Sequence, residues 1–229
     1  MALYAIADLH LSFGTDKPMD VFRGWENYTA RLEKHWRELV GPEDTVVIAG
    51  DISWGMSLPE AKADFAFLHA LPGRKLLLKG NHDYWWSTRR KMDAFLEENG
   101  FDTLRIVHND AVPVDGRWAV CGTRGWFYDA EADVDKKIVN REVGRLRTSI
   151  AAAKATGLCP AVFLHYPPVY AGAVCEEILG ALHEEGVTRC YYGHIHGAGI
   201  RRAVNGMFDG IEWRLISGDS LGFCPVLVT

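Results

Sequence analysis

The sequence predicts an α/β protein with two mixed β-sheets, and three observations support this fold class. In the first half of the chain, short apolar runs alternate with segments of helical period, as in parallel strands joined by helices. In regions 103–122 and 200–229, turn signals such as VDGR and the NG at Asn205 join strand-like pieces instead, which indicates a second sheet. No repeat, low-complexity tract or linker-like break is present, so a single domain over residues 1–229 is expected.

Five apolar runs are the expected core strands. They read LYAIAD, TVVIAGD, KLLLKGNH, AVFLHY and CYYGHIH, and they end at Asp8, Asp51, His82, Tyr166 and His196. Between them lie four segments with helical signals: two have apolar residues at helical spacing, one is bounded by Pro59 and Pro72, and one closes on Gly100. These segments are predicted helices over 27–40, 59–71, 87–99 and 135–156.

The composition is that of an ordinary globular protein, with 48% hydrophobic and 24% charged residues. A net charge of −5 argues against binding of duplex nucleic acid or an anionic membrane, because both need a clustered basic surface. The apolar N-terminal stretch lacks a positive flank and is interrupted by Asp8, so neither a signal peptide nor a membrane span is expected, and the predicted location is cytoplasmic. The five cysteines, with no CxxC pair, are interpreted as reduced core residues.

Residues that bind metals stand at the end of every expected core strand. In open α/β sheets the ligand site lies beyond the carboxyl ends of the strands, so we expect these side chains to meet there. They are Asp8 and His10, Asp51, Asn81 and His82, His165, and His194 and His196.

Chance accounts for some of these motifs and not for others. Composition alone gives roughly 0.6 Asp-x-His triplets in a chain of this length, so DLH carries little weight, and a lone GD is a common turn. The same arithmetic gives about 0.04 for GHIH and about 0.002 for GNHD. The last two are therefore the strong signals, and the shared position of all five motifs strengthens the weaker ones.

The donor types indicate two ions rather than one. Histidines, aspartates and an amide oxygen are too many for one tetrahedral zinc and suit two ions of five or six coordination. Asp51, alone at its strand end, is the expected bridge between them. A mixed oxygen and imidazole set favours Mn, Fe, Zn or Ni over Mg or Ca.

In the order DLH, GD, GNHD, H and GHIH, these motifs resemble those of the calcineurin-like metallophosphoesterases over nearly the whole chain. The resemblance implies a four-layer α/β/β/α sandwich with a dinuclear site, most readily active with manganese in vitro. By the same resemblance, one ion is held by Asp8, His10, Asp51 and His196. The other is held by Asp51, Asn81, His165 and His194.

The resemblance also implies a mechanism without a covalent intermediate, in which a metal-bridging hydroxide attacks phosphorus in line. His82 is similar to the family's catalytic histidine, which stabilises the phosphoryl oxygen or protonates the leaving alkoxide. Asp83 is expected to orient His82. Because these positions are intact, hydrolysis is favoured over the alternative, a non-catalytic metal-binding scaffold of the same fold that binds a protein partner.

Departures within the superfamily narrow the class. GDISWGM and GNHDYWW differ from the patterns of protein Ser/Thr phosphatases. UDP-diacylglucosamine hydrolases resemble the chain in ADLHLS but usually carry Arg at the position of His82, and the superfamily's DNA-repair nucleases are longer. The chain is most similar in GDISW, LPG, KGNHDYWW, GTRGW and HYPP to small bacterial proteins described as predicted phosphohydrolases.

The expected substrate is a small phosphoester, with a phosphodiester favoured over a phosphomonoester. Aromatic residues crowd the expected loops, among them Phe127 and Tyr128, and some are expected to form a wall for a flat group. Arg124 is the candidate phosphate clamp, with a surface salt bridge as its alternative. The other expected substrate-binding residues are Trp54, Trp85 and Tyr166, and the sequence leaves the oligomeric state open.

Overall fold

The structure is a computed structural model that describes residues 1–126 and 133–228. Within these ranges the first large sheet has the strand order β13-β1-β2-β3-β4, and only β13 is antiparallel to its neighbour. Its strands are β13 (Val226–Leu227), β1 (Leu3–Ile6), β2 (Thr45–Ala49), β3 (Arg74–Leu78) and β4 (Leu104–Ile106).

The second large sheet has the order β11-β12-β10-β7-β6-β5, parallel at its centre and antiparallel at both edges. Its strands are β11 (Gly206–Phe208), β12 (Ile211–Leu215), β10 (Arg189–Tyr192), β7 (Cys159–Leu164), β6 (Trp118–Thr123) and β5 (Val112–Val114). The strands β8 (Val169–Tyr170) and β9 (Ala173–Val174) pair with each other in a separate two-stranded sheet.

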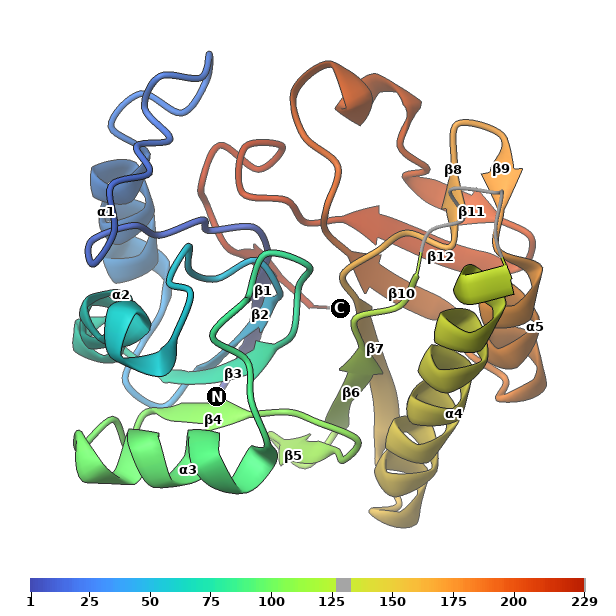
Figure 1. Ribbon diagram of the computed structural model, residues 1–229. Helices are drawn as coiled ribbons and strands as arrows, with labels where there is room; N and C mark the ends of the chain where they lie inside the picture. The colour runs from blue at the N-terminus through green and yellow to red at the C-terminus, as the bar shows by residue number, and fades with distance from the viewer. Residues whose placement is uncertain (127–132, 229) are drawn as a thin grey trace.

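Helices cover the outer face of each large sheet (Figure 1). The first sheet carries α1 (Tyr28–Leu39), α2 (Leu58–Ala70) and α3 (Arg89–Glu98), and the second carries α4 (Asp133–Ala155) and α5 (Glu176–Glu184). A short 3-10 helix, η1 (Gly197–Arg202), follows β10.

The core strands bury both of their faces, and successive residues belong to different layers. Ile48 of β2 packs among the helices, whereas Val47 faces the second sheet and joins Phe163 of β7 and Tyr191 of β10 in the core between the sheets. Side chains alternate between faces along a strand, so each strand supplies two layers of the core. The predicted four-layer α/β/β/α sandwich is confirmed.

The predicted helices are present, each starting and ending within two residues of its expected bounds. The sequence analysis did not predict α5, a nine-residue helix interrupted by Gly180. The tight turn of the C-terminal hairpin lies at Asp209-Gly210, where both residues have positive φ, and not at the expected Asn205-Gly206. Asn205 instead accepts a hydrogen bond from the Leu215 N–H through its side chain at 2.9 Å.

The cysteines are free thiols, as expected, but not all are core residues. Cys121, Cys175 and Cys190 are buried, whereas Cys159, the first residue of β7, is exposed. Within the described ranges, each helix falls short of the length or the apolar character that crossing a membrane demands. The single domain and the cytoplasmic location stay predictions.

Candidate metal centre

The metal-binding residue types predicted from the sequence lie together where the two sheets meet. Ala7, just after β1, receives a hydrogen bond from Gly218 and donates one to Ile216, which ties the first sheet to the segment after β12. This bridge aligns the carboxyl ends of β1, β2 and β3 with those of β7 and β10. The loops that follow these strands carry Asp8, His10, Asp51, Asn81, His82, His165, His194 and His196.

Asp51 occupies the centre of the group. Its Oδ2 lies 2.8 Å from Nδ1 of His82, 3.5 Å from Nε2 of His165 and 3.6 Å from Nε2 of His10. Its Oδ1 accepts a hydrogen bond of 2.7 Å from the backbone N–H of His82. One buried carboxylate therefore faces imidazoles from three different loops, as a bridging ligand has to.

His165 faces Asn81 across the boundary between the sheets. Nε2 of His165 lies 2.7 Å from Oδ1 of Asn81, and Nδ1 of His165 donates a hydrogen bond of 3.1 Å to the carbonyl of Ala49. A histidine whose Nδ1 is held by a carbonyl presents Nε2 as its ligand atom. His165 is thus oriented toward Asn81 and Asp51.

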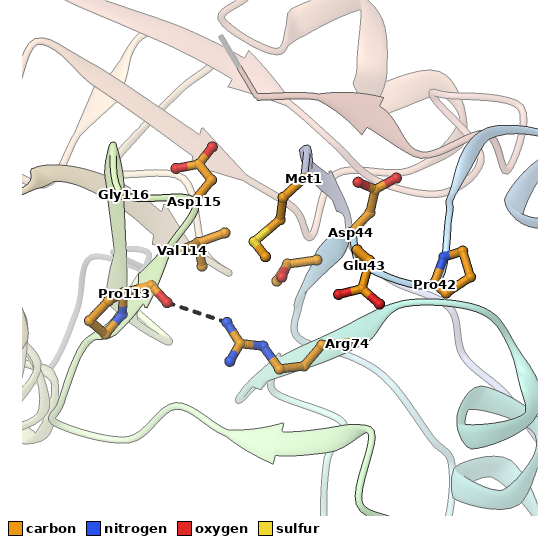
Figure 2. Close-up of a pocket in the computed structure, with 10 residues that line it drawn as sticks. Met1, Pro42, Glu43, Asp44, Arg74, Pro113, Val114, Asp115 and Gly116 are labelled. Atoms are coloured by element: carbon orange, nitrogen blue, oxygen red, sulfur yellow. Dashed lines mark hydrogen bonds between the residues drawn. The ribbon is translucent and has the colours of Figure 1, made fainter.

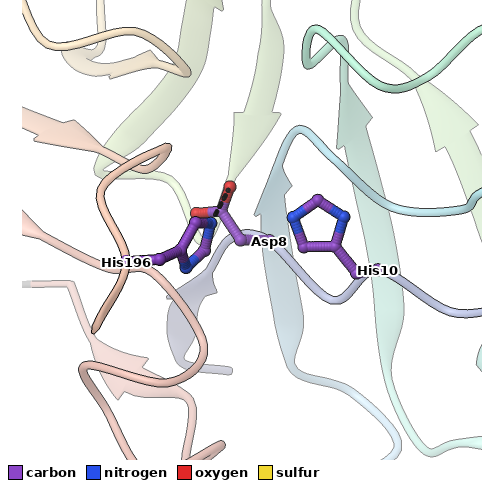
Figure 3. A group of neighbouring side chains, drawn as sticks. All are labelled: Asp8, His10 and His196. Atoms are coloured by element: carbon purple, nitrogen blue, oxygen red, sulfur yellow. Dashed lines mark ion pairs between the residues drawn. The ribbon is translucent and has the colours of Figure 1, made fainter. Parts of the chain in front are cut away.

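Asp8, His10 and His196 form a second group, drawn in Figure 3. Nε2 of His196 lies 3.4 Å from Oδ1 of Asp8. Nδ1 of His196 lies 2.9 Å from Oδ1 of Asp219, whose Oδ2 also accepts a hydrogen bond from Gly197 N–H. Asp219 was not among the residues predicted from the sequence. The Gly-Asp pair that follows β12 could have indicated it, because it resembles the pair that contains Asp51.

The backbone of the site is strained. Asp8, His10, Asp51 and His194 have positive φ angles of 58°, 44°, 51° and 73°. Non-glycine residues rarely adopt this region, and such conformations cluster at functional sites because the surrounding structure has to hold them.

Gly80 allows the loops of β2 and β3 to touch. A Cβ at this position would lie 2.1 Å from both the backbone nitrogen and Oδ1 of Asp51. The requirement is for close approach and not for a left-handed turn, because Gly80 is not among the glycines with positive φ.

Asp83 holds the loop of Asp51 and does not orient His82, which corrects the expected role. Within the described ranges, five N–H groups donate to its carboxylate, and the His82 ring is not one of them. Burial and the charge of Asp51 raise the pKa of Asp83 to about 6. The donors are the backbone of Asp51, Ile52, Ser53 and Gly80, and the indole of Trp85.

Burial and neighbouring charges shift the titration of the group in opposite directions. Burial lowers the pKa of His10 and of His194 to about 4, so both imidazoles are neutral at pH 7. Burial also acts to lower the pKa of His196, but the charges of Asp8 and Asp219 outweigh the effect of burial and raise this pKa to about 10. Burial opposes ionisation of Asp8 and Asp51, yet the facing histidines lower both pKa values, that of Asp8 to about 2.

The donor set fits divalent metal ions. Three buried atoms of the donor residues have no hydrogen-bond partner: Oδ1 of Asp8, Nδ1 of His10 and Nε2 of His196. Buried polar atoms normally have partners, so unpaired ones beside carboxylates and imidazoles suit a cation. Among the described residues, three groups could hold an ion: Asp8, His10 and His196; Asp51, His165 and His194; and His10, Asp51 and His82.

Two of the expected substrate-binding aromatics border the group. The Trp54 ring stacks on His10 at 4.9 Å between centroids and lies 4.6 Å from the His82 ring. The Tyr166 ring lies 4.3 Å from that of His194. Both positions are compatible with contact to a substrate, and that role stays a prediction.

Trp85 and Arg124 differ from expectation. Trp85 is only 2% exposed, packs against Phe65 in the core and donates to Asp83, so it is a structural residue and not part of a pocket wall. The Arg124 guanidinium lies 3.9 Å from the buried Glu142 and over the Trp126 ring at 4.9 Å. The ion pair expected as its alternative is present, but with a buried partner and not on the surface. The role of Arg124 as a phosphate clamp stays a prediction. Phe127 and Tyr128 lie outside the described residues.

A pocket of about 580 Å³ lies at the amino ends of β2 and β3, opposite the candidate metal centre (Figure 2). It contains the carboxylates of Glu43, Asp44 and Asp115 together with Arg74, which donates to the Pro113 carbonyl at 3.3 Å. No histidine lines it. The chemistry of the molecule is therefore expected at the carboxyl ends of the strands.

Known proteins resemble this chain in sequence. The model of the family described as calcineurin-like phosphoesterase matches residues 1–198. The Gene 66 proteins of Mycobacterium phages L5 and D29 are 45% identical over 58 residues and 43% identical over 98 residues. These matches cover 25% and 41% of this chain, and only 28% and 49% of the phage proteins.

Solved structures resemble it in fold. A protein of unknown function from Aquifex aeolicus, AQ665, superposes with a TM-score of 0.52 at 18% identity. Phosphopantetheinyl hydrolase (PptH) from Mycobacterium tuberculosis superposes with a TM-score of 0.54 at 13% identity. Each comparison covers 99% of this chain and 95% of the other. At such identities the likeness shows the fold alone.

Proposed function

This chain belongs to the calcineurin-like phosphoesterase family, and from that membership we propose that it hydrolyses a small phosphoester with two bound divalent metal ions. One observation carries the proposal: imidazoles from three loops surround Oδ2 of the buried Asp51, while Oδ1 of Asp8 and Nε2 of His196 face one another at 3.4 Å without a hydrogen bond. A purely structural cluster would pair these atoms within the protein.

The donors would divide between two ions, with Asp51 within reach of both groups. Asp8, His10 and His196 would hold one ion, and Asn81, His165 and His194 the other. The grouping of donor atoms within 4.8 Å of one another supports this division. Asp219 orients His196, and the Ala49 carbonyl orients His165, so the imidazoles are set before an ion arrives.

When bound, the two ions supply an activated water as nucleophile and neutralise charge on the phosphate. The chain itself supplies His82, whose side chain is about one-third exposed and adjoins Asp51. An imidazole in this place can donate a proton to the leaving oxygen or stabilise a phosphoryl oxygen. Trp54, packed on the rings of both His10 and His82, limits the positions that they adopt.

A phosphodiester is the favoured substrate, with Trp54, Tyr166 and Arg124 as candidate contacts. Aromatic rings beside the donor groups support a substrate with an organic group near the phosphate. Arg124 reaches a phosphate oxygen only if its guanidinium shares its contact with Glu142. Manganese is the metal expected to support activity in vitro, because the oxygen and imidazole donors suit it.

The test is hydrolysis of bis-p-nitrophenyl phosphate and of p-nitrophenyl phosphate by Mn²⁺-loaded protein, wild type and His82→Ala. Turnover of the diester but not the monoester, reduced about 10²- to 10⁴-fold in the variant, supports the proposal. The reverse preference contradicts the diester assignment. Full activity in a variant that keeps its metal contradicts the role of His82. A wild type without metal or turnover favours the scaffold.

A further inference from the structure

The segment between β1 and α1 holds three apolar side chains, those of Met19, Phe22 and Trp25, and Tyr28 follows at the start of α1. Met19, Phe22, Trp25 and Tyr28 are linked by successive backbone hydrogen bonds, in which each N–H donates to the carbonyl three residues earlier, at 3.0 to 3.1 Å. These bonds close successive turns, in which Gly24 and Asn27 have positive φ. Met19, Phe22 and Trp25 all line one pocket, which places them in a row on the same side of the segment.

Two further contacts fix this segment to the protein. The side chain of Asp20 accepts a hydrogen bond from Asn27 N–H at 2.8 Å, and Arg31 of α1 donates to the Gly24 carbonyl at 3.0 Å. Trp25 is buried and packs edge-on against Tyr28 and Phe223. The buried Trp25 is therefore fixed at the base of the row, and Met19 and Phe22 lie on its outer side.

A pocket of about 380 Å³ opens between this row and the metal centre. It is lined by Met19, Phe22, Arg23, Trp25, His196 and Gly197. The Trp25 ring lies 5.6 Å from the His196 ring and 5.7 Å from the His10 ring, so the floor of the pocket is in contact with the candidate ligands. A phosphate at the metals would have this pocket as its neighbour.

The chemistry of the pocket is apolar with one cationic group. Phe22 is 55% exposed and lines the pocket together with Met19 and Trp25, so it belongs to an apolar patch and is not a scattered surface residue. Arg23 brings a planar guanidinium that stacks on aromatic rings. An aliphatic chain would make no use of that group.

We propose that this pocket binds a flat aromatic group carried by the alcohol that is esterified to the substrate phosphate, as a nucleobase is carried by the sugar of a nucleotide. The inference rests on the proposed function for the position of the phosphate, and it deepens that function by naming the organic part of the substrate. The volume of the pocket lies at the small end of ligand pockets, which begin at about 300 Å³. The pocket therefore suits one ring system rather than an extended polymer.

Binding tests the inference without turnover. Calorimetry on the Mn²⁺-loaded protein compares phenylphosphonate with methylphosphonate, and on the metal-free protein adenosine with ribose. The aromatic member of each pair should bind at least about tenfold more tightly to wild type. Phe22→Ala and Met19→Ala should each remove most of that preference. Phe13→Ala should retain it, because Phe13 is 51% exposed but packs on Phe67, outside the pocket.

Equal binding of aromatic and small probes, or a preference that survives both pocket variants, contradicts the inference even if the protein hydrolyses phosphoesters. Tighter binding of octylphosphonate than of phenylphosphonate also overturns it, since the pocket then serves an aliphatic chain. If the aromatic preference is present and lost in Phe22→Ala while no phosphoester is hydrolysed, the proposed function fails and the pocket assignment holds.

Discussion

Asn81 and His165 follow strands of different sheets, yet Oδ1 of Asn81 lies 2.7 Å from Nε2 of His165. Each sheet supplies half of the candidate metal centre, and neither half is complete alone. The approach depends on small residues at the junction, above all Gly80, and on the buried carboxylate of Asp83. Folding of the two sheets against one another and formation of the site are therefore one event.

Gly80→Ala should lower the stability of the protein and distort the site. The added Cβ would meet the backbone nitrogen of Asp51 at 2.1 Å, and backbone cannot move aside cheaply. We expect a loss of about 2 kcal/mol or more in the free energy of unfolding, measured by urea denaturation. Gly144→Ala is the control, since a Cβ at this exposed position of α4 meets nothing within 4 Å. It should stabilise by up to about 1 kcal/mol; equal effects would refute the crowding at Gly80.

Asp219→Asn should weaken metal binding without unfolding the protein. The Asp219 carboxylate holds Nδ1 of His196 at 2.9 Å, and carboxylate partners of metal-binding histidines typically contribute about 10- to 100-fold in affinity. Competition with a fluorescent chelator measures the Mn²⁺ affinity. Asp209→Asn, which alters an exposed pair of Asp209 and His183, is the matched control. Unchanged affinity in Asp219→Asn would show that Asp219 serves only the η1 turn.

Truncation of two adjacent aromatic residues should change the stability of the protein by very different amounts. Trp85→Ala should cost about 3 to 5 kcal/mol of unfolding free energy, because the ring is buried and its N–H is bonded to Asp83. Tyr84→Ala should change stability by less than about 0.5 kcal/mol, since Tyr84 is 51% exposed. Chemical denaturation of both variants decides the matter, and similar losses would contradict the placement of the two rings.

Lys75 should make stability rise with pH in the alkaline range. Burial lowers the pKa of Lys75 from 10.5 to about 8, while its Nζ donates to the carbonyls of Leu71 and Gly73. Between pH 8 and 10.5 the unfolded chain then binds more protons than the folded one, so raising the pH favours folding. Wild type should gain stability relative to Lys75→Met across this window. Lys62→Met, at an exposed position of α2, controls for the loss of one charge; parallel curves for wild type and Lys75→Met would refute the prediction.

The sequence predicts the strand ends well because the signal is local. An apolar run followed by Asp, Asn or His marks the end of each core strand, and parallel strands bring those ends together without further information. Most of the helices are predicted from local signals too: apolar residues on one face mark α1 and α4, and Pro59 and Pro72 bound α2. The nine-residue α5 is short and contains Gly180, and the sequence analysis did not include it.

The roles that the sequence does not predict depend on contacts between loops. Asp83 and Trp85 lie in a turn without a regular period, so nothing local indicates that both side chains point away from His82. Asp219 stands in a Gly-Asp pair that is common in turns, and only its 2.9 Å approach to His196 distinguishes it. The pocket at Phe22 arises from a run of turns that sequence periodicity does not reveal.

The number of Mn²⁺ ions bound per chain tests the central claim most directly. Wild type and Asp51→Asn are dialysed against Mn²⁺, freed of unbound metal and measured by inductively coupled plasma mass spectrometry. Asp51 faces the donors of both ions, so the wild type should bind two ions and the variant fewer than one. A wild type without bound metal, or a variant that retains both ions, would contradict a dinuclear centre bridged by Asp51.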